Sequence, residues 1–566
     1  MREQNEPNYL KGAAILAATG IFVKIVGAIY KIPLFNVLDD EGVGYFQVTY
    51  NVYAVVLAIS TAGVPVALSR LVSSAATGGN IPLVKRYFSV ALPTFAAIGI
   101  VVMSVMYFFA NGIASEMGSS LAATGIQVLA PAVFFVCIIS VYRGYAQGFQ
   151  NMVPTAASQV VEVVSKAVFG IVVAFLLVRL GYESQYVSAG AITGVTIGLG
   201  LCIPLMMWYK RKIDRQKLHG KQEGDSQSLT KTEELSAGST DEEGAHELLS
   251  RRRTFLRIMK VSIPITLGAS LMSIMVLIDT RVVLGRLQSA LLLTESEAIE
   301  QFGIFTKGLT IYNLPPALIV PVAISIIPAI AAALTRKNKD EASRIVQSSV
   351  KLTNLISMPA CAGIMVLAGP ILTALYYDPR QSPETVATMT TILVILGAAS
   401  YFVCFQHLTI AVLQANGHER VALMTFPIGA IVKITLSYIL VANPDIGVIG
   451  SPIGTLACFA VITVLNILFI TLKVKERMKV ISGVLKPLIC ALIMAAVAYF
   501  AYEGIQWLGS GILGTRRLAV VIYLAFAILA GICVYIALIV VTRTISKEDL
   551  SHVPKGGKLA KILRVR

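Results

Sequence analysis

Long apolar segments, separated by short polar connections, make up almost the whole chain. Fourteen of them in the 566-residue sequence exceed the roughly 20 residues that a helix needs to cross a bilayer. One stretch, 210–253, breaks the pattern, because it is rich in Gly, Ser, Thr, Glu and Lys and has almost nothing apolar to bury. It is expected to stay flexible in water. The expected spans are 11–36, 44–75, 83–110, 120–148, 154–179, 185–209, 254–285, 302–334, 342–368, 385–415, 419–441, 446–472, 480–508 and 517–542.

This pattern predicts an all-α polytopic membrane protein with two six-helix lobes and a terminal pair of helices. The hydrophilic stretch separates the two lobes and is expected to be a cytoplasmic linker. The expected domains are an N-lobe (1–209), the linker (210–253), a C-lobe (254–474), and the last two spans with a cytoplasmic tail (475–566).

The connections between spans alternate in charge. Asp39–Gly42, Asn111–Gly118 and Ala442–Asp445 are acidic or neutral, whereas the alternate connections are basic. Because Lys and Arg collect in cytoplasmic loops, both termini and the linker are predicted to lie in the cytoplasm. Arg516 and Arg517 fall in an outer connection and are the exception. The basic connections carry Lys85, Arg86, Arg336, Lys337, Lys339, Lys473, Lys475, Arg477 and Lys479.

Composition supports a protein dissolved mainly in lipid. The chain is 56% hydrophobic and 14% charged, with a mean hydropathy of +0.76, well outside the usual range of soluble domains. The net charge of +16 follows from the basic loops, and no zinc spacing or basic stripe interleaved with aromatics points to nucleic acid. The seven cysteines fall singly in apolar segments, so neither disulfides nor a metal site is expected.

A weak internal repeat relates the two halves. Shifting the chain by 259 positions aligns 43–63 with 302–322, and further matches keep the same order along several spans. Each copy contains an even number of crossings, so the halves are expected to be parallel repeats about an axis along the membrane normal. The aligned pairs are Gly44 with Gly303, Phe46 with Phe305, Tyr53 with Tyr312, Lys85 with Arg344 and Ser89 with Ser348, and, after a small further shift, Gln147 with Gln414 and Lys166 with Lys433.

Ionisable side chains inside the expected spans are few, and each costs at least about 2.5 kcal/mol unless it faces a cavity or a partner. Lys24 lies near mid-depth, too far from the surface for easy snorkelling. A cavity between the repeats, lined by Lys and Arg, would attract an anion such as a phosphate. The full set is Lys24, Lys31, Glu162, Lys166, Asp279, Arg281, Lys307, His407 and Lys433, with Arg70 and Arg143 near cytoplasmic helix ends.

Each of these residues also has a structural interpretation. Arg70 and Arg143 could reach the cytoplasmic headgroups, and Glu162 could pair with Lys166 on the same helix face. His407 is interpreted as an interior histidine with satisfied hydrogen bonds. The remaining alternative is anchoring at the outer interface, and it applies to Lys31, Asp279, Arg281 and Lys307.

Prolines are concentrated in the first, second, seventh and eighth expected spans, which favours bending at a moving gate. No signature of an enzyme is present: paired carboxylates in a plausible pocket, a Walker motif and an HExxH motif are all missing from the sequence. No cofactor is expected. These prolines are Pro33, Pro65, Pro264, Pro315, Pro316, Pro321 and Pro328.

The run VYRGYAQGFQNMVPTAASQVVEVVSK, at 141–166, resembles the fourth and fifth spans of bacterial SpoVB/YtgP-type polysaccharide-biosynthesis proteins. Residues 44–72 resemble their second span and 10–35 their first. These proteins belong to the MOP (multidrug/oligosaccharidyl-lipid/polysaccharide) exporter superfamily, together with the lipid II flippases of the MurJ type. The resemblance implies two six-helix lobes around a central cavity, followed by two further helices.

The resemblance also implies a function: alternating-access transport of an undecaprenyl-pyrophosphate-linked saccharide, most simply lipid II, to the outer leaflet of the bacterial cytoplasmic membrane. This chain departs from the MurJ type, because Lys24 takes the nearest first-span arginine position, Tyr30 and Lys31 replace an Arg-Asp pair, and the second-span arginine position is apolar around Val56. The expected substrate-binding residues are Lys24, Lys31, Arg281, Lys307 and Asp279, and those expected to couple the lobes are Glu162, Lys166, Lys433, Arg70 and Arg143.

The expected partners are the lipid-linked oligosaccharide, membrane lipids, a coupling ion (sodium or proton) and cell-wall glycosyltransferases, with the chain acting as a monomer. Without a nucleotide-binding motif, an ion gradient or the membrane potential must drive transport. Two alternatives stay open at this stage. One is a multidrug/cation antiporter of the same superfamily, and the other is a non-transporting scaffold in wall or spore-coat assembly.

Overall fold

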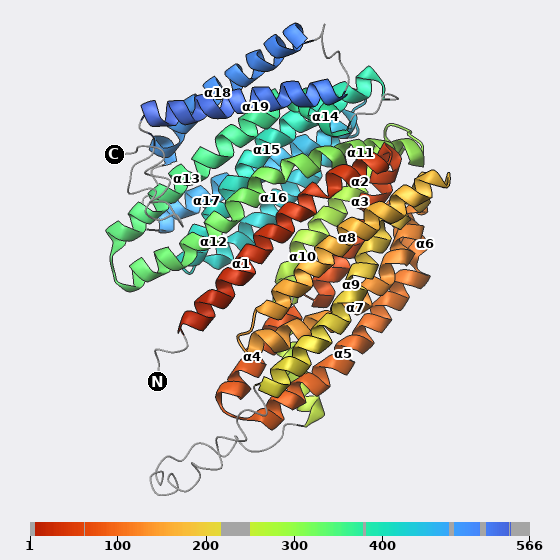
Figure 1. Ribbon diagram of the computed structural model, residues 1–566, viewed down its shortest axis with the longest axis vertical. Helices are drawn as coiled ribbons and strands as arrows, with labels where there is room; N and C mark the ends of the chain where they lie inside the picture. Colours follow the sequence, from red (N-terminus) through yellow and green to blue (C-terminus); the bar gives the residue numbers. More distant parts are fainter. Residues whose placement is uncertain are drawn as a thin grey trace, which may run out of the picture. The chain divides into compact units, whose positions relative to one another are not determined.

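Every regular element in the described part of the chain is a helix (Figure 1). The computed structural model describes residues 6–61, 63–216, 250–376, 381–474, 480–509, 517–542 and 544. The expected linker, 210–253, lies mostly outside these residues, and so does the tail after 544. The all-α prediction is confirmed. The helices of the first half are α1 (Glu6–Ile29), α2 (Lys31–Val37), α3 (Asp40–Thr61), α4 (Gly63–Thr77), α5 (Ile81–Phe108), α6 (Ala110–Glu116), α7 (Ala123–Gly148), α8 (Val153–Arg179) and α9 (Ser184–Asp214).

The second half continues the same pattern of long helices and short turns. Short 3₁₀ turns precede α7 and α17, at Ser120–Ala122 and Gly447–Ile449. The helices are α10 (Arg251–Ser289), α11 (Glu295–Tyr312), α12 (Leu314–Thr335), α13 (Lys339–Val366), α14 (Ala368–Tyr376), α15 (Pro383–Ala415), α16 (Glu419–Leu440), α17 (Gly450–Lys473), α18 (Val480–Gly509) and α19 (Arg517–Val541).

Thirteen helical segments of the described chain are long and apolar enough to cross a membrane. They correspond to all the expected spans except the seventh. That span lies in α10, whose 39 residues include the uncharged stretch 261–278. A stretch of this length is long enough to be a candidate for a crossing, so the seventh expected span stays a prediction.

Helices break where proline removes a backbone donor. The first expected span is divided into α1 and α2 at Tyr30, just before Pro33, and the eighth into α11 and α12 at Asn313, just before Pro315 and Pro316. Proline is tolerated in the first turn of a helix, where the missing N–H has no intrahelical partner. By contrast, α10 continues without interruption through Pro264.

Equivalent helices of the two halves begin with the same cap. At the start of α5, the side chain of Asn80 accepts a hydrogen bond from the backbone N–H of Leu83. At the start of α13, the side chain of Asn338 accepts one from the N–H of Glu341. Such caps satisfy a donor that the helix itself leaves unpaired. Their separation of 258 residues agrees, within one position, with the repeat found in the sequence.

The chain folds into two compact units. Unit 1 comprises Met1–Gly27 and Tyr45–Thr280, and unit 2 comprises Ala28–Gly44 and Arg281–Arg566. Three helices, α1, α3 and α10, therefore change unit along their length. The lobe boundaries drawn from the sequence stay a prediction.

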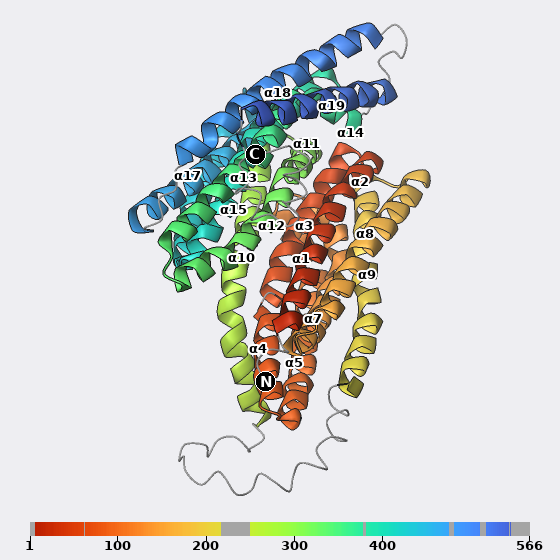
Figure 2. The same cartoon turned by 60° about the vertical axis from the view of Figure 1, so that its left-hand side comes forward.

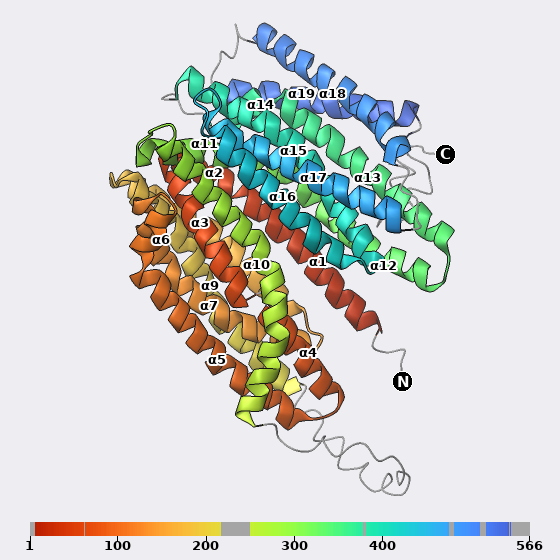
Figure 3. The same cartoon turned by 180° about the vertical axis from the view of Figure 1, so that it is seen from behind.

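Within unit 1, α7 packs against α4, α5 and α9, and α9 also packs against α8 (Figures 1 and 3). Glycines allow the closest approach: a Cβ at Gly194 would lie 2.5 Å from the backbone nitrogen of Gly170. Small residues are the usual means of bringing helices together in a membrane, where lipid removes the hydrophobic drive for association.

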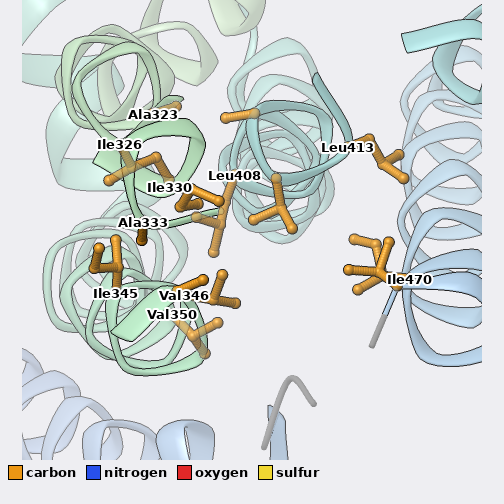
Figure 4. Packing of buried hydrophobic residues seen from close by; sticks show 14 of the residues in the cluster. Ala323, Ile326, Ile330, Ala333, Ile345, Val346, Val350, Leu408, Leu413 and Ile470 are labelled. Atoms are coloured by element: carbon orange, nitrogen blue, oxygen red, sulfur yellow. The ribbon is translucent and has the colours of Figure 1, made fainter. Parts of the chain in front are cut away.

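Within unit 2, α12, α13, α15 and α17 surround an apolar core (Figure 4). Its fully buried members include Ile330, Val346 and Leu408, which belong to three different helices. The terminal helices α18 and α19 pack against each other, α18 against α13 and α19 against α14 (Figure 2). Their side chains also join two smaller apolar clusters with these neighbours.

Candidate functional site

A deeply buried ion pair joins Lys307 of α11 to Asp40, the first residue of α3. The ammonium nitrogen of Lys307 contacts Oδ1 of Asp40, and only 5% and 9% of the two side chains are exposed. The amide of Gln381 donates a hydrogen bond of 2.6 Å to the other carboxylate oxygen, Oδ2. The same ammonium lies 5.6 Å from the ring centre of Tyr376, within the range of a cation–π contact.

Two glycines bring Asp40 to Lys307. A Cβ at Gly303 would overlap the carbonyl oxygen of Asp40, and a Cβ at Gly44 would overlap the carbonyl oxygen of Ile299. The contact is reciprocal, because Asp40 and Gly44 correspond to Ile299 and Gly303 under the 259-residue repeat. Reciprocal contacts of this kind are the mark of a two-fold relation. The first turn of α3 can therefore lie directly on α11.

Other carboxylates lie close to the ion pair of Lys307 and Asp40. The side chain of Ser296 donates a hydrogen bond of 2.7 Å to Glu41, and the side chain of Asp39 accepts one of 2.8 Å from the N–H of Gly42. Partial loss of hydration raises the pKa of the Glu300 carboxyl, and the negative charges of Asp40, Glu41, Asp39 and Glu297 raise it further. Lys307 thus meets a locally negative field.

Unit 1 contains a second charged cluster, between α7 and α8. The guanidinium of Arg143 donates a 3.0 Å hydrogen bond to Glu162 and a 2.9 Å hydrogen bond to the hydroxyl of Ser158. The side chains of Arg143 and Glu162 are 17% and 32% exposed. Arg143 therefore turns inward to α8 instead of extending to the headgroups, and Glu162 has its ion-pair partner on the neighbouring helix.

One turn further along α8, Lys166 contacts α3. Its ammonium donates a 3.2 Å hydrogen bond to the hydroxyl of Tyr50 and lies 4.4 Å from the centre of that ring. Lys433, its counterpart in the repeat, is buried in α16. These residues were expected to couple conformations. The structure joins Arg143 to Glu162 and places Lys166 on Tyr50, whereas Arg70 is exposed on α4.

The other predicted binding residues are distributed over both units. Lys24 is exposed on α1 and Arg281 is exposed on α10, whereas Asp279 is buried. Lys31 is half-buried, and its ammonium lies 5.8 Å from the ring centre of Phe35. Lys24 and Asp279 belong to unit 1, whereas Lys31, Arg281 and Lys307 belong to unit 2.

Asp40 is the functional candidate that sequence reasoning missed. The DDEG connection was interpreted only as an acidic outer loop. A usable signal did exist, since a lysine at membrane depth needs a counter-charge. The carboxylates flanking the aligned Gly44 were candidates, but only the crossing of α3 with α11 selects Asp40.

Arg517, the basic residue that did not fit the topology rule, has a structural role. Its guanidinium donates hydrogen bonds to the carbonyl oxygens of Ala374 and Leu375, at 3.0 and 2.8 Å, and to the side chain of Asn36, at 3.0 Å. A cation at the carbonyl end of a helix is favourable because it satisfies groups that the helix leaves unpaired. Arg517 therefore ties α19 to the end of α14 and to α2. Its neighbour Arg516 lies outside the described residues.

Two family models match the chain: polysaccharide biosynthesis protein at 9–334 and MatE at 300–439. Three proteins of Bacillus subtilis (strain 168) are similar over nearly their full lengths. The membrane protein YabM is 26% identical, covering 98% of this chain and 97% of its own. Stage V sporulation protein B is 25% identical, with 97% and 98% covered, and the lipid II flippase MurJ is 23% identical, with 93% and 94% covered.

Solved structures share the fold. A lipid II flippase MurJ in an inward closed conformation superposes with a TM-score of 0.67 at 15% identity, covering 94% of this chain and 98% of that one. An inward-facing multidrug resistance transporter of the MATE family superposes with a TM-score of 0.60, also at 15% identity, covering 80% and 97%. The chain belongs to the polysaccharide biosynthesis protein family, and its fold is shared with solved structures of MurJ and MATE proteins.

Proposed function

We propose that this protein is a flippase, which moves an undecaprenyl-pyrophosphate-linked saccharide from the inner to the outer leaflet of the bacterial cytoplasmic membrane. Lipid II is the favoured substrate, and alternating access is the mechanism. The full-length similarity to a lipid II flippase and to a sporulation protein supports this class of substrate. Both termini lie in the cytoplasm in this proposal, and the product serves peptidoglycan or a related wall polysaccharide.

The observation that carries the proposal is the position of Lys24. It lies within the apolar segment Ala18–Val37, yet its side chain is exposed. A cation at that depth is costly against acyl chains and favourable in a water-filled cavity that receives an anion. The pyrophosphate supplies that anion, while the polyprenyl tail stays in lipid.

The remaining basic residues extend this binding role. Lys31, Arg281 and Lys307 hold the pyrophosphate or an acidic saccharide, and Asp279 sets the geometry of the cations. Arg143, Glu162, Lys166, Lys433 and Arg70 link substrate binding to the change of conformation. Transport is driven by a sodium or proton gradient or by the membrane potential, and glycosyltransferases of wall synthesis use the product.

Replacing Lys24 tests this proposal. In cells depleted of their own lipid II flippases, Lys24→Ala is expected to reduce lipid II exposure on the outer leaflet by about 10- to 100-fold, the value of a lost hydrogen bond to a charged group. Lys24→Arg keeps the charge and is expected to retain activity. Phe22→Leu, at an exposed apolar position of the same helix, is the matched control. Undiminished flipping by Lys24→Ala would contradict the proposed cavity.

The MatE match keeps a multidrug/cation antiporter as the second candidate. Such a transporter needs carboxylates to receive a cationic drug, whereas the predicted binding residues here are four cations and one carboxylate. Efflux of a cationic dye from cells that express the protein separates the two functions. Dye efflux without lipid II exposure would favour the antiporter.

A further inference from the structure

The buried pair of Lys307 and Asp40 leaves Lys307 no free surface for a second anion. Its side chain is 5% exposed, and its ammonium already contacts the carboxylate of Asp40. If Lys307 binds a substrate phosphate, as the proposed function requires, the pair must first separate. A buried lysine left without any counter-charge is strongly unfavourable. One anion must therefore replace the other.

Asp40 is held in place from several sides. The hydrogen bond from Gln381 fixes Oδ2 while Oδ1 faces Lys307. The carboxylate also lies in the first turn of α3, where the helix dipole favours negative charge. Gly303 sets the close approach of the backbone. These contacts keep a carboxylate oxygen of Asp40 beside the ammonium of Lys307. A phosphate oxygen of a bound substrate could occupy the same position in another conformation.

We propose that Asp40 is the resident counter-ion of Lys307 and exchanges with the anionic headgroup of the substrate during transport. The inference rests on the proposed function. In one state Lys307 binds the substrate anion and Asp40 is released from it. In the state seen here Asp40 has taken its place, so the same contact that closes the site also expels the headgroup. Asp40 therefore acts through Lys307, as a competitor of the substrate anion.

Exchange makes a prediction opposite to that of a purely structural pair. If Asp40 competes with the substrate for Lys307, removing its charge should tighten anion binding and slow release. If Asp40 only orients Lys307, removing its charge should weaken anion binding. The sign of the change in affinity therefore separates the two roles.

The experiment uses the full-length protein in detergent and farnesyl pyrophosphate as the probe. Asp40→Asn is expected to bind it about tenfold more tightly than the wild type, a difference of about 1.4 kcal/mol. Lys307→Gln should bind weakly, and Asp40→Asn with Lys307→Gln should match Lys307→Gln alone. Uncharged farnesol is the control ligand, and its affinity should be the same for all variants.

Stability and transport give independent readouts. Asp40→Asn should lower the unfolding temperature, and farnesyl pyrophosphate should raise it again by more than in the wild type, because the probe replaces the missing charge. In proteoliposomes the same variant should lower both KM and kcat for a lipid-linked substrate, as expected when release is slowed.

A second variant covers the case in which Asp40→Asn does not fold. Gln381→Leu keeps the carboxylate but removes its 2.6 Å hydrogen bond, and a smaller tightening in the same direction is expected. If the wild type binds farnesyl pyrophosphate and these variants bind it with equal or lower affinity, the exchange alone is overturned. If neither the wild type nor any of the variants binds farnesyl pyrophosphate, the proposed function and the exchange are overturned together.

Discussion

Charged side chains that lie among the membrane-spanning helices of this protein fall into two groups. Lys307, Arg143 and Glu162 are held by specific partners, whereas Lys24 and Arg281 are exposed. The first group lost most of its water on folding and needs a counter-charge nearby. The side chains of the second group remain accessible to water, lipid or a ligand. The proposed function therefore predicts the most direct substrate contact at the exposed cations and the greatest effect on conformational change at the paired ones.

The Arg143–Glu162 pair gives a prediction at this scale. Arg143→Gln leaves a partly buried carboxylate without its partner and is expected to lower the free energy of unfolding by about 1–3 kcal/mol. Arg143→Gln with Glu162→Gln should recover part of this loss, since no unpaired charge remains. Thermal unfolding of the four proteins in detergent gives a double-mutant cycle. Strictly additive effects would show that the two side chains do not interact.

Much of the residue-level chemistry was visible in the sequence, but the partners were not. Glu162 and Lys166 share a helix face by their spacing. Yet Glu162 accepts a hydrogen bond from Arg143 of α7, and Lys166 donates one to Tyr50 of α3. Spacing along one helix identifies neighbours within that helix. It does not identify which other helix crosses nearby.

Single helices in this protein are shaped by proline and glycine at particular positions. Prolines lie in the first turns of α2 and α12, where the helix is interrupted, and glycines allow the first turn of α3 to pack on α11. The sequence predicted bending at prolines within continuous spans, whereas the structure interrupts the helix at Tyr30 and Asn313. The meeting of Gly44 with Gly303 was expected only as an alignment of two repeats, and the structure turns that alignment into a physical contact.

Substitution of Gly303 tests the closeness of this crossing. Gly303→Ala places a methyl group on the carbonyl oxygen of Asp40, a backbone atom that cannot swing away, and is expected to destabilise the protein by about 1–3 kcal/mol. Gly504→Ala is the matched control, because nothing lies within 4 Å of its Cβ position in α18. The control should stabilise by about 0.5–1 kcal/mol. Equal unfolding temperatures for the two variants would contradict the close contact.

At the scale of the whole molecule, the alternation of acidic and basic connections sets an orientation in the membrane. The exception at Arg517 has a local cause, because that side chain binds the end of α14 and Asn36. A guanidinium engaged in this way is bound to the protein, so its position in a predicted outer connection does not argue against the expected orientation. The orientation expected from the other connections therefore stands as a prediction.

Cysteine labelling measures this orientation. In a variant without the seven native cysteines, Ser115→Cys is expected to react with a membrane-impermeant maleimide in intact cells. Lys339→Cys should react only after the cells are permeabilised. Both positions are exposed at helix ends. The opposite labelling pattern would place the termini outside.

Sequence by itself determined that this chain lies in a membrane, where its helices run, and how its two halves correspond. These properties depend on local hydropathy and on matches at a constant shift, which need no knowledge of contacts. Only the tertiary structure decided that Lys307 pairs with Asp40, that Arg143 pairs with Glu162, and that Arg517 holds the end of α14. The physical reason is that a buried charge takes its partner from whichever helix crosses it, and the crossings depend on packing between segments far apart in the chain.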